Sequence, residues 1–305
     1  MKSSPEEAAG PDPMESMIER ARVLAEALPY IQRFDTKTMV VKYGGHAMMD
    51  PELKVSVIRD LVLMESVGMR VVIVHGGGPE ITRLMKKMGM KPKFSNGQRV
   101  TDEETLSITE MVLDGKINGE IVNEINQAGG RAVGLSGKDG RLILARRYQP
   151  VGPDGQPLGD IGYVGEVERI NPEILNVSHE HEFIPVVSPI GVDAQGQTLN
   201  INADTVAAEM AIAMKAARLI LLTDVRGICR DPSDPSTVIA TLPAAECKQM
   251  IADGIIRGGM IPKVSACLHA LEGGVEKTHV IDGRIPHALL LELFTDRGIG
   301  TQIIQ

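Results

Sequence analysis

The chain runs through Thr38-Met39-Val40-Val41-Lys42-Tyr43-Gly44-Gly45, an apolar strand that ends in a lysine and two glycines. A second junction of the same kind follows, where the apolar residues 71–74 lead into His75-Gly76-Gly77-Gly78. Glycine has no Cβ, so a ligand can approach the backbone closely, and the exposed N–H groups there can bind anionic oxygen. Two such junctions, with Lys42 on the first, predict a site for a phosphate chain or a carboxylate.

Beyond these junctions, strand-like and helix-like segments alternate to the end of the chain. Asp50-Pro51 supplies an N-cap and a first-turn proline to a helix whose apolar stripe runs from Leu53 to Met64. Residues 141–170 differ, because prolines and glycines divide them into short segments typical of antiparallel hairpins. The alternation predicts an α/β fold, a three-layer αβα sandwich with a mostly parallel central sheet, in two lobes.

Composition narrows the classes of function. A net charge of −8, with four Tyr, four Phe and no Trp, argues against nucleic-acid binding, because positive charge and stacking platforms are scarce. No apolar run approaches about 18 residues, and residues 1–13 lack the basic and apolar parts of a signal peptide. We therefore expect no membrane contact and a cytoplasmic location. Cys229, Cys247 and Cys267 are far apart and are interpreted as reduced thiols.

Common nucleotide and metal motifs do not account for the two junctions. The sequence contains neither G-x-x-x-x-G-K-[ST] nor G-x-G-x-x-G, and Gly134-Leu135-Ser136-Gly137-Lys138-Asp139 only approximates the first. His179 and His181 form an H-x-H without an acidic or cysteine partner at a suitable spacing, so no protein metal site is predicted. A phosphate ligand would therefore bind by a less common route.

The segment before the first strand divides into two parts. Residues 1–16 are predicted to form a disordered tail, and residues 17–35 a helix with an apolar stripe from Ile18 to Leu28. Pro29 should kink or end this helix. The helix either packs on the core of its own chain or serves as an oligomerisation arm, and the sequence leaves both open.

Candidate ligand-binding residues follow from the sheet, because ligands bind at the carboxyl ends of parallel strands. Lys42 and Lys263 come from distant segments and could grip one phosphate chain. Asp204, in the first turn of its helix, could hold both lysines by charge-assisted hydrogen bonds. Other strand-end residues expected at the site are Gly44, Gly45, Gly76, Gly77, Gly78, Ser188, Thr223 and Asp224.

Together these motifs resemble those of the acetylglutamate kinases, members of the amino-acid kinase family. The resemblance keeps the family's order and extends over nearly the whole chain beyond the N-terminal helix. Each motif alone is weak, and the set is specific. The matching stretches are residues 41–45, 74–79, 96–101, 134–139, 200–204 and 258–263.

The resemblance implies the amino-acid kinase fold and phosphoryl transfer from ATP, with Mg²⁺, to the γ-carboxylate of N-acetyl-L-glutamate. It implies that residues 36–198 form an N-lobe for acetylglutamate binding and dimerisation, and residues 199–305 a C-lobe for ATP. The catalytic residues would be Lys42, Lys263 and Asp204. Substrate binding would fall to Gly77, Gly78, Arg99 and Asn200, and phosphate or ATP binding to Gly44, Gly45, Thr223 and Asp224. The carboxylate is ionised at pH 7, so the reaction needs no general base.

A regulatory layer follows from the same resemblance. Helix 17–35 resembles that of arginine-inhibited members, in which it links dimers into a ring, so a homohexamer and inhibition by L-arginine are expected. The arginine site would comprise Tyr30, Arg218, His279, Glu292 and Gly298. The alternative is that Glu292 is a solvated helix residue. Binding of a PII-type signalling protein occurs in some relatives and is left open by this sequence.

Two rival functions fit the sequence less well. A kinase for a longer substrate, such as N-acetylaminoadipate, would differ by one methylene, which is worth about 1–3 kcal/mol in a pocket. A non-catalytic arginine-sensing module on the same fold would not need Lys42, Asp204 and Lys263 together.

Overall fold

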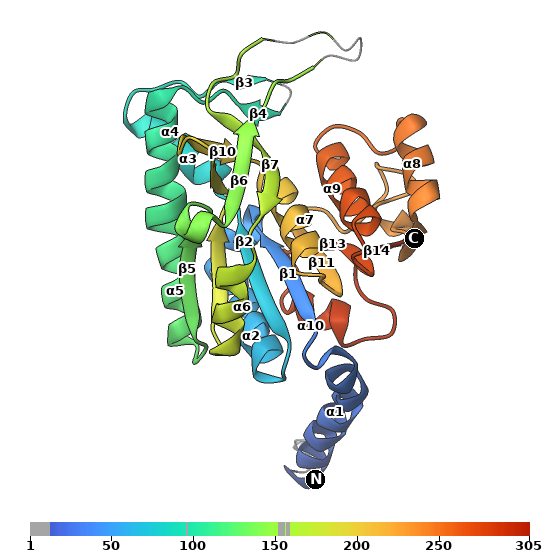
Figure 1. The fold of residues 1–305 in the computed structure, drawn as a ribbon. Helices are drawn as coiled ribbons and strands as arrows, with labels where there is room; N and C mark the ends of the chain where they lie inside the picture. The colour runs from blue at the N-terminus through green and yellow to red at the C-terminus, as the bar shows by residue number, and fades with distance from the viewer. Residues whose placement is uncertain (1–12, 96, 152–155, 157–158) are drawn as a thin grey trace, which may run out of the picture.

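The computed structural model describes residues 13–95, 97–151, 156 and 159–305. Within these residues the fold is built on an eight-stranded sheet (Figure 1). All its strand pairs are parallel except β13 with β14. From edge to edge the strands are β12 (Thr241–Pro243), β14 (Thr301–Ile304), β13 (Lys277–Asp282), β11 (Arg218–Thr223), β1 (Thr38–Tyr43), β2 (Arg70–His75), β8 (Ile184–Ser188) and β5 (Ala132–Ser136). The predicted α/β fold with a mostly parallel sheet is confirmed.

Both faces of the sheet are covered by helices, because successive strand residues point to opposite faces. On β1, Met39 and Val41 pack into one core, and Val40 packs into the other. The core of Met39 is closed by α2 (Pro51–Ser66), α3 (Gly78–Lys87), α5 (Asn118–Gln127) and α10 (Ala288–Leu293). The core of Val40 is closed by α6 (Glu173–Glu180), α7 (Ala203–Ala213), α8 (Ala244–Ala252) and α9 (Met260–Glu272). The three predicted layers are therefore present.

Short strands outside the main sheet complete the fold. The predicted antiparallel pairing within 141–170 is confirmed by β6 (Ile143–Arg147) with β7 (Val164–Ile170). These two strands close a small barrel with β9 (Ile190–Val192) and β10 (Thr198–Ile201). A separate hairpin joins β3 (Phe94–Ser95) to β4 (Gln98–Arg99).

A long helical segment packs against the sheet at β5 and β8. It comprises α4 (Glu103–Glu110), the π-helical stretch η2 (Met111–Ile117) and α5. The Asp102 side chain caps α4 by accepting a hydrogen bond from the Thr105 N–H at 2.9 Å. In a π-helix each backbone hydrogen bond spans five residues where an α-helix spans four, and this change alters the direction of the side chains that follow.

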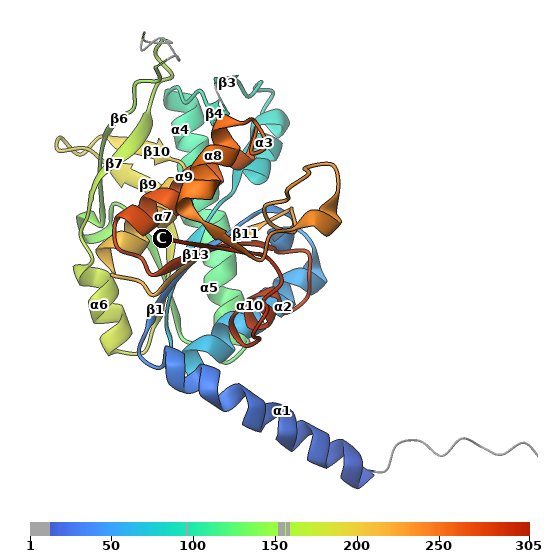
Figure 2. The same cartoon turned by 90° about the vertical axis from the view of Figure 1, so that its right-hand side faces the viewer.

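Helix α1 (Pro13–Phe34) extends away from the rest of the molecule, and only its C-terminal end is packed (Figures 1 and 2). The predicted tail of residues 1–16 is wrong for 13–16, which are helical, and its remainder lies outside the described residues. Pro29 lies inside the helix without ending it, because water can solvate the carbonyl that loses its N–H partner on so exposed a helix.

The apolar stripe of α1 faces solvent. Ile18 and Leu28 are each 51% exposed, whereas Phe34 at the end of the helix is buried. Packing of this stripe on the core of its own chain, one of the two interpretations of the sequence, is therefore wrong.

Two further features bear on the predicted organisation. Strand β1 pairs with β2 on one side and β11 on the other, so the sheet is continuous across the boundary predicted between residues 198 and 199. Among the described residues, no helix is both long and apolar enough to cross a membrane.

Candidate functional site

The two glycine junctions meet at one cavity, here called the glycine cavity, with a volume of 260 Å³. It lies at the C-terminal ends of β1 and β2, where parallel strands end together. Its lining brings together many of the predicted residues, namely Lys42, Gly44, Gly45, Gly76, Gly77, Gly78, Arg99, Asn200 and Asp204.

Asp204 pairs with two lysines that come from different elements. Lys42 Nζ lies 3.1 Å from Asp204 Oδ1, and Lys263 Nζ donates a hydrogen bond to Asp204 Oδ2 at 3.0 Å. The carboxylate is held at this point because Asn202 caps α7, accepting the Asp204 N–H at 2.8 Å. The predicted lysine–aspartate–lysine arrangement is thus present.

The charge state of this group follows from its surroundings. Burial by itself would raise the pKa of Asp204, but the ammonium groups of Lys42 and Lys263 outweigh burial and hold the pKa below its usual range. The site therefore carries one negative and two positive charges, and the excess positive charge favours an anionic ligand.

A second cavity, here called the β11 cavity, has a volume of 530 Å³ and lies beyond the end of β11. Lys263 lines it, whereas Lys42 and Asp204 line the glycine cavity, so the contact between Lys263 and Asp204 joins the two. Its lining includes Thr223 and Asp224 as predicted, and also three arginines that sequence reasoning missed, Arg226, Arg257 and Arg284. Arg257 directly precedes the Gly258-Gly259 pair, which was a usable signal.

Asp224 lines the β11 cavity and holds the first glycine junction, which lines the glycine cavity. Its Oδ1 accepts the His46 N–H at 2.7 Å. Gly45 has a φ of +72°, and a Cβ there would lie 2.5 Å from Asp224 Oδ1. Only glycine fits this combination of left-handed backbone and close carboxylate.

The Thr223 hydroxyl is already used within the chain. It donates to the Ile281 carbonyl at 3.0 Å and accepts the Val225 N–H at 3.3 Å. Thr223 therefore shapes the β11 cavity by fixing the turn after β11.

Arg99 is a buried cation in the wall of the glycine cavity. Its Nη2 donates to the Gly78 carbonyl at 3.0 Å and to Thr82 Oγ1 at 2.8 Å, and its guanidinium lies 4.8 Å over the Phe94 ring. Burial lowers the pKa of Arg99. No carboxylate among the described residues pairs with it, so its charge is available for an anionic ligand.

Asn200 is tied to the segment that carries Arg99. Its Nδ2 donates to Thr101 Oγ1 at 3.3 Å, and that hydroxyl donates to the Arg99 carbonyl at 2.8 Å. The predicted substrate residues therefore share one wall of the cavity.

A third cavity, here called the α1 cavity, has a volume of 140 Å³ and lies between α1, β13 and α10. All five residues predicted for an arginine site line it: Tyr30, Arg218, His279, Glu292 and Gly298. Sequence reasoning missed the other charged residues of its lining, which are Arg33, Lys277, Asp296 and Arg297.

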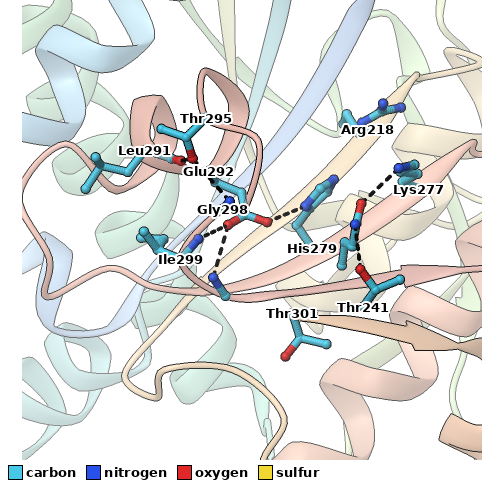
Figure 3. Close-up of polar contacts among 12 residues, drawn as sticks. Arg218, Thr241, Lys277, His279, Leu291, Glu292, Thr295, Gly298, Ile299 and Thr301 are labelled. Atoms are coloured by element: carbon cyan, nitrogen blue, oxygen red, sulfur yellow. Dashed lines mark hydrogen bonds and ion pairs between the residues drawn. The ribbon is translucent and has the colours of Figure 1, made fainter. Parts of the chain in front are cut away.

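Glu292 is not a solvated helix residue, because it is 8% exposed and its carboxylate is fully engaged. It accepts from His279 Nδ1 at 2.7 Å, from the Ile299 N–H at 2.7 Å and from the Gly300 N–H at 3.1 Å (Figure 3). Burial alone would raise the pKa of Glu292, but these donors lower it, so the carboxylate is ionised. Gly298 is required there, because a Cβ would lie 2.6 Å from Glu292 Oε2.

Tyr30, Arg218 and His279 also place polar groups at the α1 cavity. Tyr30 donates to Asp296 Oδ1 at 2.5 Å, which ties α1 to the C-terminal loop. Arg218 donates to Glu276 at 3.0 Å and lies 5.3 Å over the Phe34 ring. Burial lowers the pKa of His279, and its Nε2 has no hydrogen-bond partner among the described residues.

Within the described ranges, no group of three or more His, Cys, Asp or Glu side chains could hold a metal ion.

The sequence matches the model of the amino acid kinase family over residues 37–282. The acetylglutamate kinase of Moorella thermoacetica is 55% identical over 291 residues, which cover 95% of this chain and 98% of that enzyme. The acetylglutamate kinase of Methanocaldococcus jannaschii is also 55% identical, over 95% of this chain and 98% of its own length.

Solved structures share the fold of this chain. N-acetylglutamate synthase from Neisseria gonorrhoeae, complexed with coenzyme A and N-acetyl-glutamate, matches 93% of this chain with a TM-score of 0.80 and 27% identity. The synthase complexed with coenzyme A and L-arginine matches 93% with a TM-score of 0.78 and 26% identity. This chain covers 63% and 65% of those two chains, less than two thirds of the synthase. Carbamate kinase from Giardia lamblia, 15% identical with a TM-score of 0.63 over 88% of this chain and 98% of its own, shares the fold.

Proposed function

The chain belongs to the amino-acid kinase family, and within it to the acetylglutamate kinases, and from this premise we propose that it phosphorylates the γ-carboxylate of N-acetyl-L-glutamate with ATP. The observation that carries the proposal is the contact of Lys42 and Lys263 with Asp204, where the glycine cavity adjoins the β11 cavity. The nucleotide occupies the β11 cavity, the acyl amino acid occupies the glycine cavity, and the phosphoryl group crosses between the lysines.

The reaction needs charge neutralisation more than proton transfer. A γ-carboxylate oxygen bonds to the γ-phosphorus as the bond from that phosphorus to the β–γ bridging oxygen breaks, and ADP leaves. No proton changes place, because the carboxylate is already ionised at neutral pH. The barrier comes from bringing two anions together, and Lys42, Lys263 and the N–H groups of Gly44, Gly45 and Gly77 offset it.

Asp204 orients the lysines. Without the Asp204 carboxylate, the ammonium groups of Lys42 and Lys263 would repel each other and turn toward solvent. With it, both remain directed at the junction of the cavities, so little reorganisation is needed when the phosphoryl group transfers.

Mg²⁺ fits this site as an ion carried mainly by the nucleotide. Asp224 is the residue that brings a carboxylate to the lining of the β11 cavity. Its side chain is 44% exposed, and one of its oxygens already accepts the His46 N–H. Mg²⁺ commonly keeps waters and phosphate oxygens and takes one or two carboxylates, which this donor set can provide. When bound, it would supply further neutralisation of phosphate charge.

Substrate recognition falls to the wall that carries Arg99 and Asn200. A buried guanidinium that has no carboxylate partner among the described residues suits the α-carboxylate of acetylglutamate, which it can bind as a bidentate pair. Gly77 and Gly78 border the same space and present backbone groups to the substrate.

Inhibition by L-arginine in a homohexamer is the regulatory part of the proposal. The α1 cavity gathers the five expected residues, and its lining carries both acidic and basic side chains, which suits an amino acid that bears a carboxylate and two cationic groups. The His279 Nε2 atom, which has no partner among the described residues, offers a further acceptor. The Neisseria synthase that resembles this chain is complexed with L-arginine. The exposed stripe of α1 would pair with α1 of a second copy, which would link dimers into a ring.

The test is an assay of the purified protein with ATP, Mg²⁺ and N-acetyl-L-glutamate, with hydroxylamine to trap the acyl phosphate and with L-arginine added or omitted. We expect trapped product that arginine suppresses. Product from N-acetylaminoadipate but not from acetylglutamate would overturn the substrate assignment. Arginine binding without any product would favour the non-catalytic sensing module, and product indifferent to arginine would overturn the regulatory part.

A further inference from the structure

His75, the last residue of β2, is fully buried beneath the second glycine junction and takes no part in the chemistry described above. Its Nδ1 lies 2.9 Å from the Gly76 carbonyl oxygen, and its Nε2 lies 3.3 Å from Asn118 Nδ2. The same Asn118 Nδ2 donates to the Val186 carbonyl at 2.8 Å. These four groups form one buried network of three hydrogen bonds.

The donor and the acceptor of each hydrogen bond in this network can be assigned. A carbonyl oxygen only accepts, so His75 Nδ1 carries the proton. Burial lowers the pKa of His75 to about 4, so the ring is neutral and Nε2 accepts from the Asn118 amide. Asn118 therefore selects the imidazole tautomer that can donate to Gly76.

The Gly76 carbonyl in turn sets the direction of the next N–H. In a trans peptide the C=O and the following N–H point to opposite sides, so a carbonyl turned toward His75 turns the Gly77 N–H away from it. The Gly76 N–H is bonded to the Tyr43 carbonyl at 2.8 Å, and the Gly77 carbonyl accepts the Ile81 N–H at 3.0 Å. The Gly77 N–H has no acceptor among the described residues, and Gly77 lines the glycine cavity.

The helical segment that carries Asn118 also holds Gly77 from the outside. A Cβ on Gly77 would lie 2.4 Å from Leu113 Cδ2 and 2.6 Å from Ile117 Cδ1, so these η2 side chains pack directly on the glycine. The segment is itself fixed to the sheet, because Asp114 accepts hydrogen bonds from Ser136 and Ser188 at the ends of β5 and β8.

We propose that His75 and Asn118 are positioning residues for phosphoryl transfer, which hold the Gly76–Gly77 peptide so that the Gly77 N–H points at the transferring group. This inference rests on the proposed role of the Gly77 N–H in the kinase reaction. Neither residue is among the described residues that line the glycine cavity, so the two side chains act only through the peptide.

Two substitutions of His75 separate positioning from packing. The amide nitrogen of an asparagine falls close to the place of histidine Nδ1, so His75→Asn keeps a donor for Gly76. The amide of a glutamine falls near the place of Nε2, so His75→Gln loses that donor and keeps a partner for Asn118. Both variants remove the same ring from the core, and their melting temperatures provide the measure of packing.

We expect kcat to fall at least tenfold more in His75→Gln than in His75→Asn, toward the loss of about 10²-fold typical of a missing oxyanion donor. The KM for acetylglutamate should change little in either. Asn118→Ala should reproduce the kcat loss of His75→Gln, and combining the two should add little, because both break the same network.

Equal kcat in His75→Asn and His75→Gln, or losses that follow melting temperature, would overturn the proposal. If neither His75 variant folds, Asn118→Ala alone decides, since an unchanged kcat in that variant also overturns it. Absence of acyl phosphate from the wild-type protein would instead overturn the proposed function, and this inference with it.

Discussion

The Nζ atom of Lys42, at the end of β1, lies 3.1 Å from Oδ1 of Asp204, in the first turn of α7. Both residues are buried, at 8% and 6% exposure. Removing two charges from water costs free energy, and buried ion pairs often contribute less stability than apolar residues of the same volume. A buried Lys42–Asp204 pair that also holds the half-buried Lys263, at the edge of two cavities, is therefore better explained by binding and chemistry than by stability.

Lys263→Ala should lower kcat by about 10²-fold or more, with a KM for acetylglutamate close to that of the wild type, because Lys263 lines the nucleotide side of the site. Steady-state kinetics with each substrate varied in turn provide the measurement. Lys248→Ala is the matched control, since this lysine forms an exposed ion pair with Glu272 at 2.8 Å and should leave kcat unchanged. A proportionate loss in binding and turnover would contradict the role of Lys263 in the transition state.

Arg99→Lys should raise the KM for acetylglutamate by about 10-fold to 100-fold, since a charge-assisted hydrogen bond is worth about 1.5–3 kcal/mol and lysine cannot form the bidentate pair. The KM for ATP should not change. Arg131→Lys is the control, because Arg131 lies 4.5 Å over the Phe183 ring much as Arg99 lies 4.8 Å over Phe94, yet it does not line the glycine cavity. Equal effects of the two substitutions would show that only stacking was lost.

Removal of residues 1–28 should produce a smaller, active oligomer. This truncation removes the exposed stripe of α1 but keeps Tyr30, bonded to Asp296, and Phe34, which is buried. Light scattering should report a dimer in place of a hexamer, and calorimetry should still detect L-arginine binding in the α1 cavity. A truncated protein with the mass of the full-length assembly would refute the assignment of α1 as the ring contact.

Glu65 should make stability depend on pH. Its carboxyl group accepts the Val71 N–H at 3.0 Å, and burial raises its pKa from 4.5 to about 7. The folded state then holds a proton that the unfolded state has released, so this contribution is complete below pH 4.5 and is lost as the pH rises through 7. Glu65→Gln should reduce the fall in unfolding free energy between pH 5 and pH 8, by at most about 3 kcal/mol.

Urea unfolding at the two pH values measures this difference. Glu52→Gln, in the exposed first turn of the same helix, is the control and should keep the wild-type dependence on pH. A Glu65→Gln protein with an unaltered pH dependence would show that another group is responsible.

Local features of the fold were predictable because their partners are close in sequence. Asp50 was expected to cap α2, and its side chain accepts the N–H groups of Glu52 and Leu53 at 2.9 and 3.0 Å. The strand–glycine junctions were likewise visible, because an apolar run followed by glycines is a local signal. The contact of Asp204 with both lysines was inferred from chemistry and family resemblance together.

Other features depended on residues that are distant in sequence. Nothing in residues 13–34 distinguishes a stripe that faces solvent from one that packs on the core, and only the docking of Phe34 decides it. A glutamate on a helix is usually exposed, but Glu292 is enclosed by His279 and by the backbone of residues 299–300. The pairing of His75 with Asn118 was not anticipated, since the two residues are 43 positions apart and only His75 belongs to a recognised motif.

The sequence by itself determined the order of strands and helices, the glycine turns and the caps. The strands and helices follow from local apolar periodicity, and the turns and caps from hydrogen bonds between residues close in sequence. The tertiary structure alone decided which strand ends share a cavity and which buried groups face each other. Helix α7 packs on β1 and on α9 only in the folded protein, and this packing brings Asp204 to Lys42 and Lys263. Such contacts form when apolar burial compensates for closing long loops, which is a property of the whole chain.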